Sequence, residues 1–223
     1  MERIDERLAK AVDEYIEGLF VPPDEALRQN LRDAGAAGLP DIAVSPVQGK
    51  LLYLIAKIAG ARRILEIGTL AGYSTTWLVR ALPPQGELVT LEVDAKHAEV
   101  ARKNLERTGI GALIDIRVGP AADSLRALIE SGEAPFDLIF IDADKPSYSD
   151  YLNLSLQLSH RGTVILADNV IRNGRALDPA PDDPNAKGVC AYNQAVASHP
   201  RLESIIVPMI REKLDGMSIS IVR

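Results

Sequence analysis

Acidic and amide side chains follow two apolar runs of the chain, each at the point where the run ends. The first run, residues 136–141, is followed by Asp142, and the second, residues 162–167, is followed by Asp168 and Asn169. Each run is typical of a buried strand, and the carboxyl ends of parallel strands meet at the sheet edge where ligands bind. We therefore expect these three side chains to converge if the two strands are neighbours.

Two carboxylates and an amide carbonyl form a set of hard oxygen ligands. Such a set suits Mg²⁺, Mn²⁺ or Ca²⁺, with water or substrate in the remaining positions. Zinc is disfavoured because the three histidines have no ligand-like spacing and the chain has a single cysteine, Cys190. The alternative is that Asp142 and Asp168 cap the helices that follow, but the clear apolar runs before both favour a metal site.

Two more charged residues, Asp144 and Lys145, follow directly after Asp142. We interpret Asp144 as a helix cap or as a residue behind the metal ligands. A nearby divalent cation would disfavour the charged form of Lys145, and a neutral amine there could accept a proton from a hydroxyl group. The alternative for Lys145 is an ordinary surface lysine. The histidines are interpreted as surface or packing residues.

A glycine-containing turn follows another apolar run, residues 63–67. The turn runs from Gly68 to Gly72 with the spacing G-x-x-x-G, which differs from the G-x-G-x-x-G of dinucleotide sites. Glu92 ends the next run, where an acidic side chain can accept both hydrogen bonds of a ribose diol. Although the turn alone could be an ordinary connection, the two features together predict a site for an adenosine-type ligand, such as NAD or S-adenosylmethionine.

The scaffold for these residues is predicted by seven short apolar runs with helix-length segments between most of them. Continuous apolar strands that alternate with helices indicate a parallel sheet covered on both faces. Only a short turn at 212–216 separates the last two runs, which predicts an antiparallel hairpin at the end of the sheet. The runs are residues 63–67, 87–93, 113–118, 136–141, 162–167, 205–207 and 218–222.

The pattern before residue 61 is helical. Apolar residues recur every three or four positions from Ile4 to Phe20 and so share one helix face. Ser45 and Pro46 are typical of the N-cap and first residue of another helix, which we expect to end near Gly60.

The composition is that of an ordinary globular protein, with 47% hydrophobic and 25% charged residues among 223. The net charge of -6 argues against nonspecific binding to nucleic acid or anionic membranes. No run approaches the roughly 18 apolar residues of a membrane span, and the charged N-terminus is unlike a secretory signal, so we expect a cytoplasmic protein. We interpret residues 1–223 as one α/β domain, with a helical extension over 1–60 and a core over 61–223.

Three motifs in this order resemble the cation-dependent O-methyltransferase family, which includes catechol O-methyltransferase, the caffeoyl-CoA O-methyltransferases and small bacterial relatives. Residues 65–74 are similar to the family's cofactor loop, and residues 141–145 and 168–170 to its metal motifs. The resemblance covers about residues 45–223. It implies a Rossmann-like class I methyltransferase fold ending in a β-hairpin, S-adenosylmethionine as cofactor, a divalent cation, and a homodimer.

The resemblance also implies roles for single residues. Asp142, Asp168 and Asn169 match the metal ligands, and Lys145 matches the catalytic lysine. The positions that match the cofactor site are Val44 in a segment that closes over the cofactor, Glu66, Gly68, Thr69 and Ser74 in the loop, Glu92 at the ribose, Ala121 beside the adenine, and Asp142.

The acceptor pocket departs from catechol O-methyltransferase. Ala143 stands where that enzyme has a bulky aromatic residue, as in the caffeoyl-CoA branch, and aromatic residues make up only 4% of the chain. Arg172 and Asn173 follow the metal asparagine and either face the substrate or belong to a polar loop. The physiological acceptor therefore stays open.

The expected reaction is methyl transfer from S-adenosylmethionine to a hydroxyl of a catechol-type, caffeoyl-like small molecule, with Mg²⁺ as the expected cation. Three alternatives remain at this point. An NAD-dependent oxidoreductase is disfavoured by the glycine spacing, and a metal-independent methyltransferase of RNA or protein by the net charge and the oxygen ligands. A non-catalytic binding module would keep the cofactor loop but lack the metal set.

Overall fold

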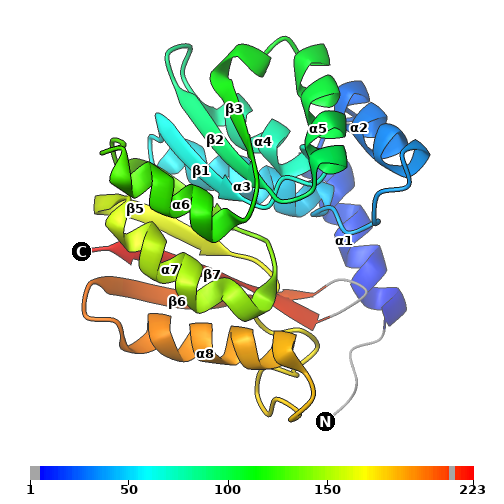
Figure 1. The fold of residues 1–223 in the computed structure, drawn as a ribbon. Helices are drawn as coiled ribbons and strands as arrows, with labels where there is room; N and C mark the ends of the chain where they lie inside the picture. Colours follow the sequence, from blue (N-terminus) through cyan, green and yellow to red (C-terminus); the bar gives the residue numbers. More distant parts are fainter. Residues whose placement is uncertain (1–5, 211–213) are drawn as a thin grey trace.

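The computed structural model describes residues 6–210 and 214–223. Within them lies a seven-stranded sheet with the strand order β3-β2-β1-β4-β5-β7-β6 (Figure 1). The first five strands pair in parallel, and the last two form the predicted antiparallel hairpin. The strands are β1 (Arg63–Ile67), β2 (Glu87–Glu92), β3 (Ile114–Val118), β4 (Phe136–Ile141), β5 (Ser159–Ala167), β6 (Leu202–Ile210) and β7 (Leu214–Val222).

Helices cover both faces of this sheet, which confirms the predicted α/β class. No helix within the described ranges is long and apolar enough to span a membrane. The helices are α1 (Glu6–Phe20), α2 (Glu25–Ala36), α3 (Pro46–Ile58), α4 (Tyr73–Ala81), α5 (Ala95–Arg107), α6 (Ala121–Glu130), α7 (Tyr148–Gln157) and α8 (Pro184–Ser198), with short 3-10 turns η1 (Gly111–Leu113) and η2 (Lys145–Ser147).

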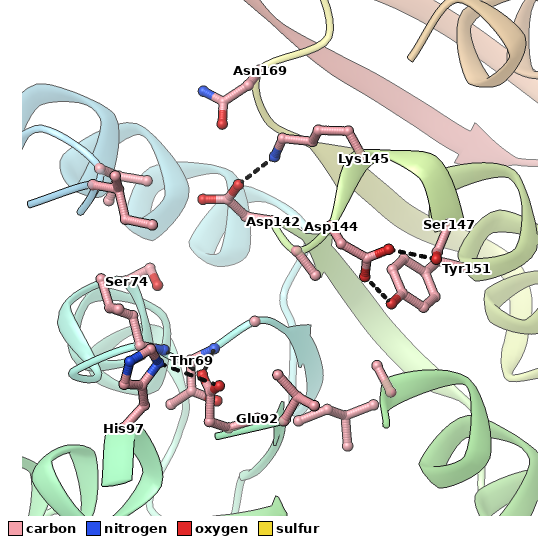
Figure 2. Close-up of a pocket in the computed structure, with 18 of the residues that line it drawn as sticks. Thr69, Ser74, Glu92, His97, Asp142, Asp144, Lys145, Ser147, Tyr151 and Asn169 are labelled. Atoms are coloured by element: carbon pink, nitrogen blue, oxygen red, sulfur yellow. Dashed lines mark hydrogen bonds and ion pairs between the residues drawn. The ribbon is translucent and has the colours of Figure 1, made fainter. Parts of the chain in front are cut away.

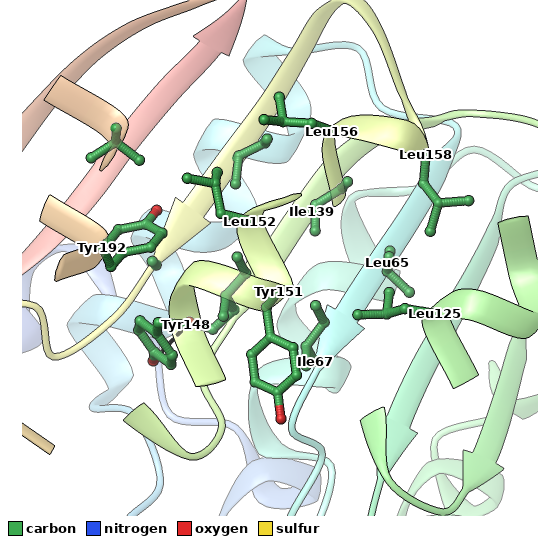
Figure 3. Close-up of a cluster of buried hydrophobic side chains, with 14 of the residues drawn as sticks. Leu65, Ile67, Leu125, Ile139, Tyr148, Tyr151, Leu152, Leu156, Leu158 and Tyr192 are labelled. Carbon is green, nitrogen blue, oxygen red and sulfur yellow. Dashed lines mark hydrogen bonds between the residues drawn. The ribbon is translucent and has the colours of Figure 1, made fainter. Parts of the chain in front are cut away.

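Strand β4 shows why the predicted runs end in several consecutive apolar residues. Successive side chains of a strand point to opposite faces of the sheet. Leu138 and Phe140 pack into a cluster with α3 and α4, whereas Ile139 and Ile141 pack into a cluster with α6, α7 and α8, part of which Figure 3 shows. All four are fully buried. Since both faces are covered there, positions 138–141 are all apolar, whereas Asp137 near the start of the strand is only half-buried and accepts hydrogen bonds from the backbone nitrogens of Arg62 and Arg63.

The hairpin strands are longer than their apolar runs. Strand β6 begins at Leu202 and β7 at Leu214, several residues before the predicted runs. Polar residues such as Glu203 and Asp215 are included because backbone pairing holds a hairpin, and its exposed side tolerates polar side chains. The predicted turn at 212–216 therefore overlaps the start of β7, and its residues 212–213 lie outside the described residues.

The N-terminal helices form where the apolar spacing and the Ser45–Pro46 pair predict them. Ser45 is the N-cap of α3, and its side chain accepts a hydrogen bond from the backbone nitrogen of Gln48 at 3.0 Å. The apolar stripe of α1 is largely exposed, with Leu8 and Phe20 each at 62%. Ile4, which the prediction placed on this helix, lies outside the described residues.

Helices α3 and α4 approach each other closely at Gly49. A Cβ atom at this position would lie 2.2 Å from the indole nitrogen of Trp77, so no larger residue fits without movement of the helices. This contact keeps α3 against the sheet-covering helix that follows the glycine turn.

We expect Gly49→Ala to lower the free energy of unfolding by about 1–3 kcal/mol, because overpacking outweighs the gain in helix propensity. Gly35→Ala in α2 is the matched control, since nothing lies within 4 Å of its added Cβ. It should raise stability by about 0.5–1 kcal/mol. Urea denaturation of both variants tests this, and an equal effect of the two substitutions would contradict it.

Candidate active site

Four neighbouring strands end in one row at the carboxyl edge of the sheet. The register pairs Leu91 of β2 with Ile67 of β1, Ile67 with Ile141 of β4, and Ile141 with Ala167 of β5. The positions just beyond this row therefore share the same edge. They are Glu92, Gly68, Asp142 and Asp168.

A cavity of about 810 Å³ opens at this edge. Figure 2 shows Asp142, Lys145 and Asn169 toward one end of it, and Thr69 and Glu92 toward the other. Two of the predicted site residues, Glu66 and Asp168, are buried behind its wall rather than lining it. The predicted residues that line the cavity are Val44, Gly68, Thr69, Ser74, Glu92, Ala121, Asp142, Lys145 and Asn169.

The carboxylate of Glu92 is held by the glycine turn. Its Oε2 atom accepts hydrogen bonds from the backbone nitrogens of Thr69 at 3.2 Å and Leu70 at 2.8 Å, and its Oε1 atom accepts one from Asp94 at 2.9 Å. A carboxylate has about four acceptor positions, so these three donors leave about one position open to a hydroxyl in the cavity. These bonds also hold Leu70 in a left-handed conformation, with φ 51°.

His97, interpreted from the sequence as a surface or packing residue, lines the cavity. Its Nδ1 atom lies 3.6 Å from Oε1 of Glu92. Helix α5 carries it there because Asp94 caps that helix directly after β2. The sequence signal was the position of His97 five residues after Glu92, in the first turn of the helix that follows the predicted ribose site.

Glu66 supports the glycine turn from below. Its carboxylate accepts hydrogen bonds from the hydroxyls of Ser74 at 2.6 Å, Thr75 at 2.5 Å and Thr90 at 2.7 Å. Burial raises the pKa of Glu66 to about 7, while the three hydroxyl donors act in the opposite direction. Ser74 therefore lines the cavity and also belongs to the hydrogen-bond network of Glu66, which fixes the first turn of α4. A direct contact between Glu66 and a cofactor stays a prediction.

Gly68 joins the glycine turn to the metal motif. Its φ is +102°, a value that side-chain-bearing residues rarely adopt, and an added Cβ would lie 2.1 Å from the carbonyl oxygen of Asp142. The backbones of β1 and β4 can approach each other this closely only with glycine at this position. The predicted cofactor turn and the predicted metal ligand are thus in direct contact.

The Lys145 amine lies in a chain of hydrogen bonds that ends at Asp168. Its Nζ atom donates to Oδ1 of Asp142 at 2.8 Å and to the hydroxyl of Tyr148 at 2.5 Å. The Tyr148 hydroxyl in turn donates to the backbone carbonyl of Asp168 at 2.9 Å. Burial, together with the charges of Asp142 and Asp168, raises the pKa of Tyr148, so this phenol stays protonated and serves as a donor.

Helix α8 supports Lys145 from behind. A Cβ at Gly188 would lie 2.2 Å from the carbonyl oxygen of Lys145, so only a glycine lets α8 pack against η2 at this point. Neither Tyr148 nor Gly188 was identified from the sequence, because their contacts with Lys145 depend on how α7 and α8 pack.

Asp168 is a buried carboxylate close to a second one. Burial and the negative charge of Asp142 raise the pKa of Asp168 to about 7. A cation between the two would remove this repulsion, which fits the expected metal site. Asn169 has a left-handed backbone with φ 58°, a conformation that asparagine tolerates better than most residues.

The donor set is made of two acids and an amide. Within residues 6–210 and 214–223, no group of three or more His, Cys, Asp or Glu side chains is placed to hold a metal. Gln48 donates from Nε2 to Oδ1 of Asp168 at 3.5 Å and also accepts from the Ser45 backbone. The sequence contained the signal for Gln48, since Ser45-x-x-Gln48 is a capping box.

Asp144, interpreted from the sequence as a helix cap or as a residue behind the metal ligands, has hydrogen-bond partners outside the predicted metal set. It occupies the N-cap position of η2, and its carboxylate accepts hydrogen bonds from Ser147 Oγ and Tyr151 OH, each at 2.5 Å. All three residues line the cavity beside Ala143 (Figure 2). They give this wall a polar character that composition alone did not indicate.

Comparisons with known proteins agree with this geometry. A family model described as O-methyltransferase matches residues 22–221. The chain belongs to this family. The match confirms the resemblance seen in the sequence and identifies the protein as an enzyme of the O-methyltransferase class, in place of the oxidoreductase alternative.

Named relatives of this O-methyltransferase align with it over nearly its full length. The chain is 46% identical to a catechol O-methyltransferase from Niastella koreensis, over 99% of this chain and 100% of the relative, and 45% identical to one from Mycobacterium tuberculosis, over 95% of each. Among solved structures, an O-methyltransferase from Bacillus cereus in complex with SAH superposes with a TM-score of 0.95 at 41% identity, covering 98% of this chain and 100% of the other. One from Streptomyces achromogenes in complex with SAM gives 0.93 at 39%, with 99% of each covered.

The raised pKa of Glu66 makes a prediction about pH and stability. The folded protein keeps a proton on Glu66 up to about pH 7, whereas the unfolded chain releases it near 4.5. The stabilisation from this group is therefore complete below pH 4.5 and is lost as pH rises through 7. Relative to Glu66→Gln, the wild type should lose about 2 kcal/mol between pH 5.5 and 7.5.

Urea denaturation at several pH values measures this difference. Glu130→Gln, at the exposed end of α6, is the matched control and should follow the wild type at every pH. Parallel curves for the wild type and Glu66→Gln would show that burial does not raise the pKa of this carboxyl.

Proposed function

We propose that this enzyme transfers a methyl group from S-adenosylmethionine to a hydroxyl of a catechol-type small molecule and requires a divalent cation. The observation that carries the proposal is the single cavity that joins Glu92, at the glycine turn, to the oxygen set around Asp142. The relatives named catechol O-methyltransferase support the acceptor class, and the solved relatives with SAH and SAM support the cofactor.

The cofactor end of the cavity is assigned to residues of the glycine turn and its neighbours. Glu92 would bind a ribose hydroxyl through the acceptor position that its three backbone donors leave open. Ser74 and Thr69 would bind the methionine part, with Val44 and Ala121 closing the cavity over the cofactor. Glu66 would act mainly through Ser74, which it holds in place.

The acceptor end is assigned to the oxygen set. Asp142, Asp168 and Asn169 would hold the cation, Mg²⁺ in the first place and Mn²⁺ or Ca²⁺ as alternatives, since all three prefer oxygen ligands. The cation would supply Lewis acidity and would template the two oxygens of a catechol. The protein residues orient the acceptor hydroxyl toward the cofactor, and such positioning accounts for much of the rate gain.

Lys145 is assigned as the residue that accepts the hydroxyl proton. Its amine is buried in the cavity wall and is oriented by Asp142 and by the phenol of Tyr148. Because Tyr148 bonds to the Asp168 carbonyl, this arrangement fixes the amine relative to both predicted carboxylate ligands. The proton would pass from the acceptor oxygen to Nζ as this oxygen bonds to the methyl carbon, while the bond from that carbon to the sulfonium sulfur breaks and leaves S-adenosylhomocysteine.

The whole chain is proposed to act as one methyltransferase unit, in the cytoplasm and as a homodimer. Exposed apolar side chains such as Leu8, Tyr15 and Phe20 on α1 support self-association, since such surfaces are typical of protein interfaces. The net charge of -6 supports a small molecule rather than nucleic acid or a membrane as the partner.

The test is methyl transfer from S-adenosylmethionine to caffeic acid, with Mg²⁺ and again with excess EDTA, followed by mass spectrometry of the product. We expect product with Mg²⁺ and none with EDTA, because the acceptor oxygens bind through the cation. Equal product in both would remove the roles given to Asp142, Asp168 and Asn169. No product with a wide range of catechols would overturn the acceptor class.

Substitution of the predicted metal ligand Asp142 tests the metal site directly. Asp142→Ala should lose Mg²⁺ binding and lower kcat/KM by at least about 100-fold. Asp123→Ala is the matched control, since this exposed carboxylate of α6 lies outside the cavity. An active Asp142→Ala enzyme without bound metal would contradict the proposal.

A further inference from the structure

Arg172 lies on the border between the cavity and a second, outer hollow. It belongs to the loop that follows β5, three residues after Asn169, and it lines both spaces. The outer hollow has a volume of about 590 Å³ and continues along the same loop to α8. Along the chain, Arg172 thus follows the predicted cation ligand Asn169 rather than the cofactor turn.

The guanidinium of Arg172 has unused binding capacity. Across the described ranges, its Nε atom is buried without a hydrogen-bond partner, and no carboxylate lies within ion-pair distance of the side chain. Other basic side chains nearby have partners: the Lys145 amine lies 2.8 Å from Oδ1 of Asp142, and Arg175 pairs with Asp183 at 3.7 Å. A buried donor without a partner costs free energy, which a ligand that accepts its hydrogen bond would recover.

The backbone holds Arg172 in this place at a cost. Arg172 and Asn173 both have left-handed conformations, with φ 53° and 55°, which residues with long side chains rarely adopt. The hairpin maintains them: Oδ1 of Asp215 accepts from the backbone nitrogen of Arg172 at 3.0 Å, and Asn173 donates to the carbonyl of Leu214 at 2.8 Å. Strained residues that the surrounding structure enforces are typical of functional sites.

We propose that Arg172 determines acceptor specificity by binding a carboxylate on the catechol substrate. This rests on the function proposed above and narrows its acceptor to acidic catechols. A planar carboxylate matches the two parallel donors of a guanidinium. A group with several phosphates fits less well, because the outer hollow beyond Arg172 is lined by three acids, Asp178, Asp182 and Asp183, which would repel it.

The test compares 3-(3,4-dihydroxyphenyl)propionate with its methyl ester, since the saturated spacer keeps the ring hydroxyls alike. Kinetics with Mg²⁺ and saturating S-adenosylmethionine are measured for the wild type, Arg172→Met and Arg172→Lys. We expect Arg172→Met to raise the KM of the acid at least about tenfold more than that of the ester, with kcat changed to the same extent for both. Arg172→Lys keeps the positive charge and should therefore retain part of the wild-type preference for the acid, measured as the ratio of the two KM values.

The control is Arg175→Met, which removes the neighbouring arginine that pairs with Asp183 and should leave the ratio of the two KM values as in the wild type. Equal changes for acid and ester in Arg172→Met would overturn the inference. If the wild type methylates neither compound, the proposed function fails for these acceptors. In that case, calorimetric titration of both compounds into the protein with Mg²⁺ and S-adenosylhomocysteine tests the role of Arg172. Equal binding of the acid and the ester would overturn this role. Tighter binding of the acid that is lost in Arg172→Met would support it.

Discussion

The register of the four central parallel strands determines where Glu92, Gly68, Asp142 and Asp168 lie. Because side chains alternate across a sheet, a slip of one residue in β4 would move Asp142 away from Gly68 and exchange the two apolar faces of the strand. Burial of Leu138 and Phe140 on one face and of Ile139 and Ile141 on the other prevents such a slip. The packing of the core therefore also fixes the positions of these active-site residues, because both depend on the same strand register.

The same edge of the sheet concentrates buried carboxyl groups. Glu66 is compensated by three hydroxyl groups from within the fold, whereas Asp168 has a nearby carboxylate and few donors. This difference in hydrogen-bond donors indicates different roles for Glu66 and Asp168. A carboxylate that the protein itself satisfies can be structural, and one that it leaves poorly satisfied is suited to an external cation.

The sequence was sufficient for the features that depend on local pattern. The strands with buried faces, the Ser45 cap and the polar residues after β4 and β5 follow from spacing alone. It was insufficient where a contact joins distant segments, as between Tyr148 and the Asp168 carbonyl or between Gly188 and Lys145. It also underestimated β6 and β7, because hairpin strands with an exposed side carry polar residues that interrupt an apolar run.

The close packing of α8 at Gly188 has an evolutionary consequence. The loop between β5 and α8 is fixed at both ends: the Val170 nitrogen donates to the Gly216 carbonyl at 3.0 Å, and α8 rests on the Lys145 backbone. The stretch at 177–182 lies between these anchors and forms part of the outer wall. Mutations and insertions there can diversify the range of acceptors, while the residues assigned to methyl transfer keep their positions.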